Sequence, residues 1–284
     1  YSLAETGCSL CLIFIMYYGG FGTNWKPARP VAVQSVLLST LGVLLTAGLT
    51  GLFIHLVLRL SWLESLLIGS VIASTDAASV FNILRSRSLN LKFNTASLLE
   101  LESGSNDPMS YMLTVVLVTL MTGGDISVPL VLAKQLVFGI LFGVCIGIAA
   151  SFLLRRSHAA MAQGDTIFVF AAALIAYALP SMLGGNGYLS VYLCGILMGN
   201  APIAQKRDLV RFFDAITGIT QMMIFFLLGL LVTPAQLPRV FVPALCILAF
   251  LTLVGRPVAV AALLAPFRAK AGQIALVSWA GLRG

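Results

Sequence analysis

Long apolar runs separated by short polar stretches fill the chain from end to end. A helix that crosses a bilayer needs about 20 mostly apolar residues, and runs of about this length divide the chain into ten predicted spanning helices. Their ranges are 3–18, 31–58, 62–84, 96–121, 135–154, 166–183, 187–201, 212–232, 240–265 and 273–284. The pattern predicts an all-α polytopic membrane protein. Because the first and last runs look cut short, we expect an internal fragment of a longer transporter.

Composition supports a membrane protein and narrows its partners. Hydrophobic residues make up 59% of the chain, charged residues 10%, and the mean hydropathy is +1.01, whereas soluble domains are about 45–50% apolar and about 25% charged. The five cysteines lie in apolar runs, so they are expected to be buried hydrophobes. The net charge of +7 comes without interleaved aromatic residues, which excludes a nucleic-acid binder. We expect a lipid bilayer as the surroundings, no nucleic acid and no cofactor.

The basic residues fall mainly on one side of the predicted topology. Of seventeen Lys and Arg, twelve lie in one set of alternate loops and three in the other, and cytoplasmic loops carry the excess of positive charge. This predicts a multi-pass protein of the cytoplasmic membrane whose basic loops face the cytoplasm. The other two, Arg256 and Arg283, lie within apolar runs and need partners there.

The third apolar run contains many small polar residues around one carboxylate. Residues 69–79 are rich in Gly, Ala, Ser and Thr, and Asp76 falls near the middle of the membrane. Small residues alone would indicate a tight helix interface. Ser, Thr and Asp side chains compete with helical hydrogen bonds, so we predict a break between Ala73 and Ala77. Broken transporter helices expose carbonyls and helix ends that bind cations.

The fourth run carries a polar stripe at membrane depth. Helical spacing places Ser103, Asn106, Asp107 and Ser110 on one face, and Pro108 removes a backbone donor beside Asp107. A single Asn or Ser would indicate a polar helix contact. A charge near the bilayer centre, however, costs roughly 2.5–3.5 kcal/mol and marks functional pathways. Two aspartates on adjacent runs therefore favour a functional site.

Glu102 points away from this stripe. It lies about 100° around the helix from Ser103, and an unpaired charge at this depth would be too costly. We predict a structural charge pair between Glu102 and Arg256 of the ninth run.

Carboxylate, hydroxyl and carbonyl oxygens, such as those of the third and fourth runs, suit hard cations. No cluster of His and Cys in the sequence offers a transition-metal site. Burial favours the protonated form of a carboxylic acid, so a proton and a monovalent cation can compete for Asp107. Such competition, combined with alternating access, suffices for obligatory exchange. We expect Thr75, Asp76 and Ser103 to supply further oxygens and Asn106 to tie the two helices together.

Several motifs resemble those of the monovalent cation:proton antiporter-1 family, of the NhaP type of bacterial K⁺(Na⁺)/H⁺ antiporters. They are Ser-Thr-Asp-Ala-Ala at 74–78, Glu-Ser-Gly-Ser-Asn-Asp-Pro at 102–108, Val-Tyr-Leu-Cys-Gly at 191–195, Gly-Arg-Pro at 255–257 and Gly-Leu-Arg-Gly at 281–284. The resemblance covers the chain from about Gly19 to its C-terminus.

The resemblance implies a sodium/proton-antiporter-like fold of about thirteen helices in two inverted repeats, of which about ten are present and two are discontinuous. It implies a homodimer with interface helices in 1–30 and 162–232, a core in 31–125 and 240–284 and a linker helix at 133–156. Arg283 would offset helix-end charge at the second broken helix. K⁺ is the favoured cation and Na⁺ the alternative, and an Asn106–Asp107 pair in place of two aspartates implies electroneutral exchange.

Two other functions use membrane carboxylates. An intramembrane aspartyl protease needs Gly-x-Gly-Asp, whereas Asp107 follows Ser105-Asn106 and Asp76 follows Ser74-Thr75. A passive cation channel would conduct the cation without moving protons. The sequence favours an antiporter, which is not an enzyme, over both.

Overall fold

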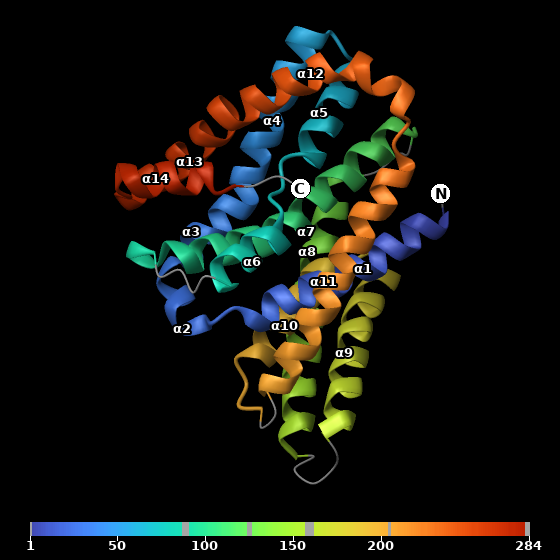
Figure 1. Cartoon of the computed structure of the whole chain (residues 1–284), viewed down its shortest axis with the longest axis vertical. Coiled ribbons are helices and arrows are strands. Elements are labelled where there is room, and N and C mark those ends of the chain that lie inside the picture. The colour runs from blue at the N-terminus through green and yellow to red at the C-terminus, as the bar shows by residue number, and fades with distance from the viewer. Residues whose placement is uncertain (1, 87–90, 124–126, 157–161, 204–205, 282–284) are drawn as a thin grey trace. The chain divides into compact units, whose positions relative to one another are not determined.

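The computed structural model describes residues 2–86, 91–123, 127–156, 162–203 and 206–281, which are almost entirely helical (Figure 1). Six helical stretches in this part of the chain are long and apolar enough to cross a membrane. They are Leu3–Gly22, Trp25–Leu58, Val128–Arg156, Gly164–Met182, Lys206–Leu231 and Pro234–Phe267. The prediction of an all-helical, membrane-spanning chain is confirmed. The helices form two compact units: unit 1 holds Tyr1–Lys26 and Pro129–Val232, and unit 2 holds Pro27–Val128 and Thr233–Gly284.

Unit 1 is built around the short apolar helix α10. Its helices are α1 (Ser2–Gly22), α8 (Val128–Arg156), α9 (Ala162–Met182), α10 (Gly187–Gly199) and α11 (Lys206–Leu231). Helix α10 begins at Asn186, whose side-chain oxygen accepts a hydrogen bond from the Leu189 amide at 3.0 Å, as expected of a helix N-cap. It packs against both α1 and α9, and α1 also packs against α11.

Glycines allow α1 and α10 to touch backbone to backbone. A Cβ atom added to Gly199 would lie 2.0 Å from the Phe21 carbonyl oxygen, and one added to Gly195 would lie 2.5 Å from that of Tyr17. Small residues at helix interfaces in membranes permit such close approach. The glycines of α10 therefore set the distance between the two helices.

This packing gives a stability prediction. We expect Gly199→Ala to lower the free energy of unfolding of the purified protein in detergent by about 1–3 kcal/mol, because the added methyl group forces the backbones apart. Gly218→Ala in α11 is the matched control, since a Cβ there meets nothing within 4 Å. Equal unfolding midpoints for the two variants would show that the α1–α10 contact does not require glycine.

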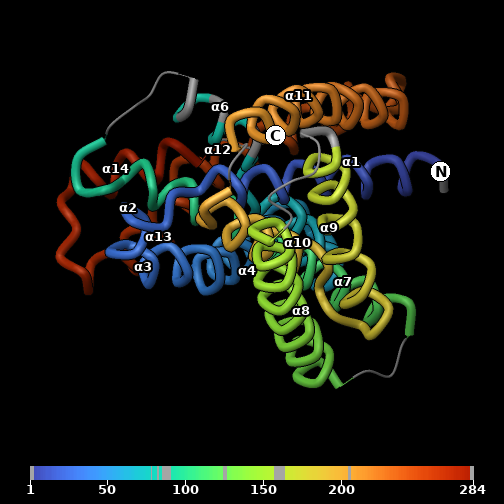
Figure 2. The backbone as a smooth tube through the Cα atoms, turned by 90° about the horizontal axis from the view of Figure 1, so that it is seen from below, coloured from blue at the N-terminus to red at the C-terminus, as the bar shows by residue number. Residues whose placement is uncertain are grey.

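Unit 2 contains two long helical stretches that are each interrupted by a π turn. The first runs from α2 (Trp25–Ala28), which begins in unit 1, through η1 (Arg29–Val31), α3 (Ala32–Leu37) and the π turn η2 (Leu38–Gly42) to α4 (Val43–Leu58). The second runs from η4 (Pro234–Gln236) through α12 (Leu237–Phe250) and the π turn η5 (Leu251–Gly255) to α13 (Arg256–Leu264) and η6 (Ala265–Phe267). Helix α13 lies beside α3 (Figure 2) and also contacts η2, while α4 lies against α12 and η5.

Further helices complete unit 2. They are α5 (Trp62–Val71), α6 (Ala77–Ser86), η3 (Lys92–Asn94), α7 (Thr95–Met121) and α14 (Ala271–Trp279). A capping box starts α5: the Ser61 hydroxyl accepts from the Glu64 amide at 3.3 Å, and the Glu64 carboxylate accepts from the Ser61 amide at 3.1 Å. This cap reverses the chain after α4, so α5 returns along α4. A buried apolar cluster joins η1, η2, α6, α7, α13 and α14, with Leu38, Leu98 and Val260 among its members.

Candidate functional site

The third apolar run forms two half-helices with a break between them. Helix α5 ends at Val71 and α6 begins at Ala77, and residues 72–76 are not helical. The break predicted between Ala73 and Ala77 is therefore present. Its small polar residues lie beside the polar stripe of α7, which runs without interruption through Pro108.

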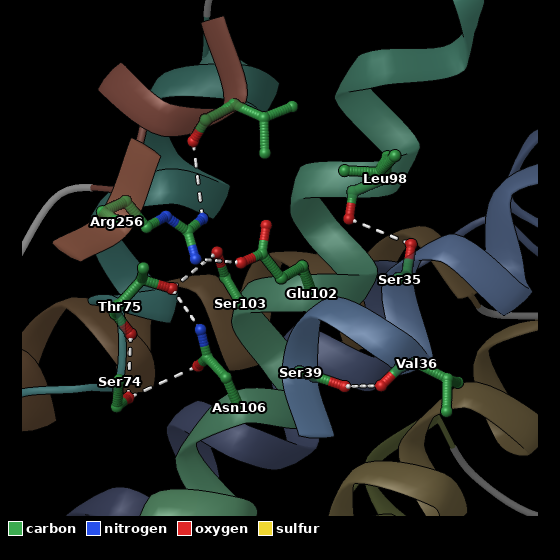
Figure 3. Close-up of polar contacts among 11 residues, drawn as sticks. Ser35, Val36, Ser39, Ser74, Thr75, Leu98, Glu102, Ser103, Asn106 and Arg256 are labelled. Carbon is green, nitrogen blue, oxygen red and sulfur yellow. Dashed lines mark hydrogen bonds and ion pairs between the residues drawn. The ribbon is translucent and has the colours of Figure 1, made fainter. Parts of the chain in front are cut away.

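Four side chains from the break and from α7 form one hydrogen-bond chain (Figure 3). The Thr75 hydroxyl donates to Ser103 Oγ at 3.0 Å, and Asn106 Nδ2 donates to Thr75 Oγ1 at 2.6 Å. The Ser74 hydroxyl lies 3.3 Å from Asn106 Oδ1. Thr75, Ser103 and Asn106 are almost fully buried. Asn106 therefore joins the break to α7, as the sequence predicted for this residue.

Asp107 joins this chain through Ser74. The Ser74 hydroxyl is hydrogen-bonded to Asp107 Oδ1, and both side chains are partly buried. Ser74 was not among the predicted site residues, although it belongs to the Ser-Thr-Asp motif. The hydroxyl has a single proton to donate, so the acceptors around it, Asp107 Oδ1, Asn106 Oδ1 and the Thr75 carbonyl at 3.3 Å, compete for one donor.

Asp76 faces its own helix. Its Oδ1 atom accepts from the Ser79 amide at 3.2 Å, and the Ser79 hydroxyl donates to Oδ2. This is the geometry of an N-cap, so the Asp76 carboxylate satisfies free backbone donors where α6 begins. Among the described residues Asp76 is hydrogen-bonded to Ser79 of its own helix, and its side chain remains partly exposed.

The end of α5 is anchored on α7 by hydroxyl groups. The Ser110 hydroxyl donates to the Ser70 carbonyl oxygen at 2.5 Å, and Ser70 Oγ lies 3.2 Å from Thr114 Oγ1. A helix end leaves carbonyl groups without intrahelical partners, and α7 supplies a partner here. The break therefore has a fixed position along the polar stripe.

Glu102 and Arg256 form a buried ion pair on another side of α7 (Figure 3). Arg256 Nη1 lies 2.5 Å from Glu102 Oε1, and the side chains are 5% and 0% exposed. Arg256 Nη2 also donates to the Val277 carbonyl at 3.4 Å near the C-terminal end of α14, where a positive charge is favourable. Arg283, expected to act at this helix end, lies outside the described residues.

The described residues hold no group of three or more His, Cys, Asp or Glu side chains placed to bind a metal. Beside the break lies the partly buried carboxylate of Asp107, which hydrogen bonds connect to hydroxyl and carboxamide oxygens. Such a site suits a proton or a hard monovalent cation.

A broken membrane helix packed on a carboxylate-bearing helix is typical of ion-coupled secondary transporters. The chain belongs to the sodium/hydrogen exchanger family, whose transmembrane family model matches residues 2–284. The predicted family resemblance is therefore confirmed. It is a family of transporters and not of enzymes.

Two relatives and one solved structure illustrate the similarity. The chain is 40% identical to the K(+)/H(+) antiporter NhaP of Alkalimonas amylolytica, covering 97% of this chain and 48% of the relative. It is 36% identical to the K(+)/H(+) antiporter NhaP2 of Shewanella baltica (strain OS223), and the match covers 100% of this chain and 50% of the relative. It superposes on the sodium proton antiporter MjNhaP1 of Methanocaldococcus jannaschii with a TM-score of 0.86 at 24% identity, covering 99% of this chain and 70% of that one. The fold is therefore that of an antiporter, and the chain spans about half the length of the relatives.

Proposed function

We propose that this chain carries the ion-binding part of a K⁺/H⁺ antiporter, with Na⁺ as the alternative cation. The observation that carries the proposal is the hydrogen-bonded placement of Asp107 at the helix break, with Ser74, Thr75, Ser103 and Asn106 around it. The similarity to relatives named K(+)/H(+) antiporters supports K⁺. Asp76 contributes indirectly, because its carboxylate caps the start of α6 and so fixes one side of the break.

The proposed mechanism is competition between a cation and a proton for the Asp107 carboxylate. In the cation-bound state the Ser74 hydroxyl donates to the ionised carboxylate and holds it in place. When Asp107 takes up a proton, its negative charge is lost and the hydroxyl can turn to Asn106 Oδ1, which lies 3.3 Å away. Exchange then requires that the site open to one side of the membrane at a time. One exchanging carboxylate, beside a neutral Asn106, gives electroneutral exchange.

We further propose the arrangement that the resemblance implies. Residues 1–30 and 162–232 would form the homodimer interface, residues 31–125 and 240–284 the moving core, and residues 133–156 a linker. The protein would lie in the cytoplasmic membrane with its basic loops in the cytoplasm. Cysteine accessibility scanning of the loops in intact cells tests this orientation.

The function is tested with the complete protein in sealed vesicles that hold a pH gradient. Addition of K⁺ is expected to collapse the gradient without generating a membrane current, with a weaker response to Na⁺ or Li⁺. A passive channel gives the opposite result, because it carries a cation current and leaves proton movement uncoupled. A current that scales with K⁺ at constant internal pH would therefore replace the antiporter proposal with a channel.

Ser74→Ala is expected to raise the K⁺ concentration that gives half-maximal exchange by about tenfold. The reason is that a hydrogen bond to a charged group contributes about 1.5–3 kcal/mol, and this one positions the carboxylate. The matched control is Ser105→Ala on α7, whose hydroxyl, within the described part of the chain, donates to the Leu101 carbonyl of its own helix at 2.6 Å. The K⁺ titration of the control should match the wild type. If both variants shift equally, the Ser74 contact has no special part in cation binding.

A further inference from the structure

Unit 1 contains a groove between α8 and α10 that is separate from the proposed ion site. Its volume is about 540 Å³, within the range of ligand-binding pockets. Most lining side chains are aliphatic or aromatic, from Val144 to Phe152 on α8 and from Leu193 to Leu197 on α10. Polar residues occur only toward one end, where Ser151, Arg155, Asn200 and Trp25 line it.

The polar end of the groove has a wall fixed by hydrogen bonds and an exposed cationic side chain. The Trp25 amide donates to Asn200 Oδ1 at 2.9 Å, while Asn200 Nδ2 donates to the carbonyl oxygens of Thr23 and Ile196. Trp is typical of the membrane–water interface. Arg155, in the last turn of α8, is exposed and has no ion-pair partner among the described residues. The mouth of the groove is therefore positively charged.

One helical turn deeper lies an unsatisfied buried hydroxyl. Ser151 lines the groove and is 8% exposed, and within the described part of the chain its Oγ atom has no hydrogen-bond partner. A buried polar group without a partner is costly. A ligand oxygen that lies one helical turn deeper in the groove than Arg155 would accept a hydrogen bond from the Ser151 hydroxyl.

The groove, from its charged mouth to its deep apolar end, has about the length of one membrane leaflet. Val144, Ile148, Ser151 and Arg155 follow one face of α8, and the span from Val144 to Arg155 is about 16 Å along the helix. Half of a bilayer hydrocarbon core is about 15 Å. Beside this face α8 is fixed against α10 by Gly139, Gly143 and Gly147, because a Cβ on any of them would lie within 3 Å of α10 or of Asn186 just before it. The groove is therefore bounded by helices that cannot slide freely past each other.

We propose that this groove binds one anionic phospholipid, with its phosphate at Arg155, its glycerol ester oxygens at Ser151 and an acyl chain along Ile148 and Val144. The order of charge, hydroxyl and apolar wall along α8 matches the order of these groups in a phospholipid. Attraction of Arg side chains to anionic lipids near the membrane surface provides the headgroup selectivity. The proposal concerns binding and is independent of the proposed ion exchange.

The test uses the complete protein, delipidated in detergent and examined by native mass spectrometry. Phosphatidylglycerol, phosphatidylcholine with the same acyl chains, and glycerol phosphate are titrated separately. We expect one phosphatidylglycerol adduct at about fivefold lower concentration than the phosphatidylcholine adduct, and none with glycerol phosphate. Binding of glycerol phosphate alone, or equal affinity for the two lipids, would overturn the proposal.

Two pairs of variants distinguish lipid binding in the groove from attraction of the lipid to surface charge in general. Arg155→Gln should weaken the phosphatidylglycerol adduct by about fivefold, whereas Arg156→Gln should not, because Arg156 stacks on Phe152 at 5.0 Å and does not line the groove. Ile148→Trp should fill the apolar wall and remove the adduct. Ile140→Trp, on a part of α8 outside the groove, should keep it.

Other occupants of the groove give distinct results. If Arg156→Gln weakens binding as much as Arg155→Gln, the lipid is held by charge alone and the groove is not its site. If Ile148→Trp changes the oligomeric state on gel filtration but leaves the lipid adduct unchanged, a second copy or another segment covers the groove. Either result overturns the lipid site.

Discussion

Asp107→Asn is expected to abolish K⁺-driven collapse of a pH gradient, down to the level of vesicles without protein. Asparagine has nearly the shape of aspartate but cannot take up or release a proton, so the competition that drives exchange is lost. The Ser74 hydroxyl can still donate to the side-chain oxygen, so the local hydrogen-bond geometry is retained. The measurement is the rate of internal pH change after K⁺ addition, at several pH values.

Stability separates this effect from misfolding. An uncharged amide is less costly to bury in a membrane protein than an aspartate, so the unfolding midpoint of Asp107→Asn should equal or exceed that of the wild type. Asp208→Asn, an exposed residue in the first turn of α11, removes the same charge elsewhere and should leave exchange unchanged. Exchange that persists in Asp107→Asn would disprove the assignment of this residue as the exchanging carboxylate.

Helical periodicity and local composition were sufficient to predict which side chains of α7 face the site and where the neighbouring helix breaks. The spacing of Ser103, Asn106 and Asp107 placed them on one face of α7, and the structure joins all three to the break. The concentration of Ser, Thr and Asp in 69–79 predicted the break itself, because these residues weaken a helix by bonding to nearby backbone groups.

Side-chain partners at the break could not be predicted in the same way. Whether Asp76 faces Asp107 or caps α6 depends on the residue at which the helix restarts, and a shift of one residue turns the side chain by about 100°. The same uncertainty concealed Ser74, which reaches Asp107 only because residues 72–76 leave the helix. The π turns at Leu38–Gly42 and Leu251–Gly255 have no local sequence pattern that distinguishes them from ordinary helix.

The largest stability effect is expected at the Glu102–Arg256 pair. Removing one partner of a buried ion pair leaves a charge without compensation and costs about 3–5 kcal/mol. Glu102→Gln leaves the Arg256 guanidinium, which is almost fully buried, with only the Val277 carbonyl as a hydrogen-bond partner among the described residues. Arg256→Met leaves a carboxylate that is completely buried. Thermal unfolding of the purified complete protein in detergent measures both losses.

The double variant Glu102→Gln with Arg256→Met should recover most of the lost stability. It buries no charge, and only the bond to the Val277 carbonyl is lost, which is worth about 0.5–1.5 kcal/mol. The coupling energy in this double-mutant cycle should therefore be about 5–9 kcal/mol, because two single losses of about 3–5 kcal/mol are replaced by one small loss. Arg239→Met, which removes an exposed charge from α12, should change stability by less than about 0.5 kcal/mol. Additive losses in the double variant would mean that the two residues act independently.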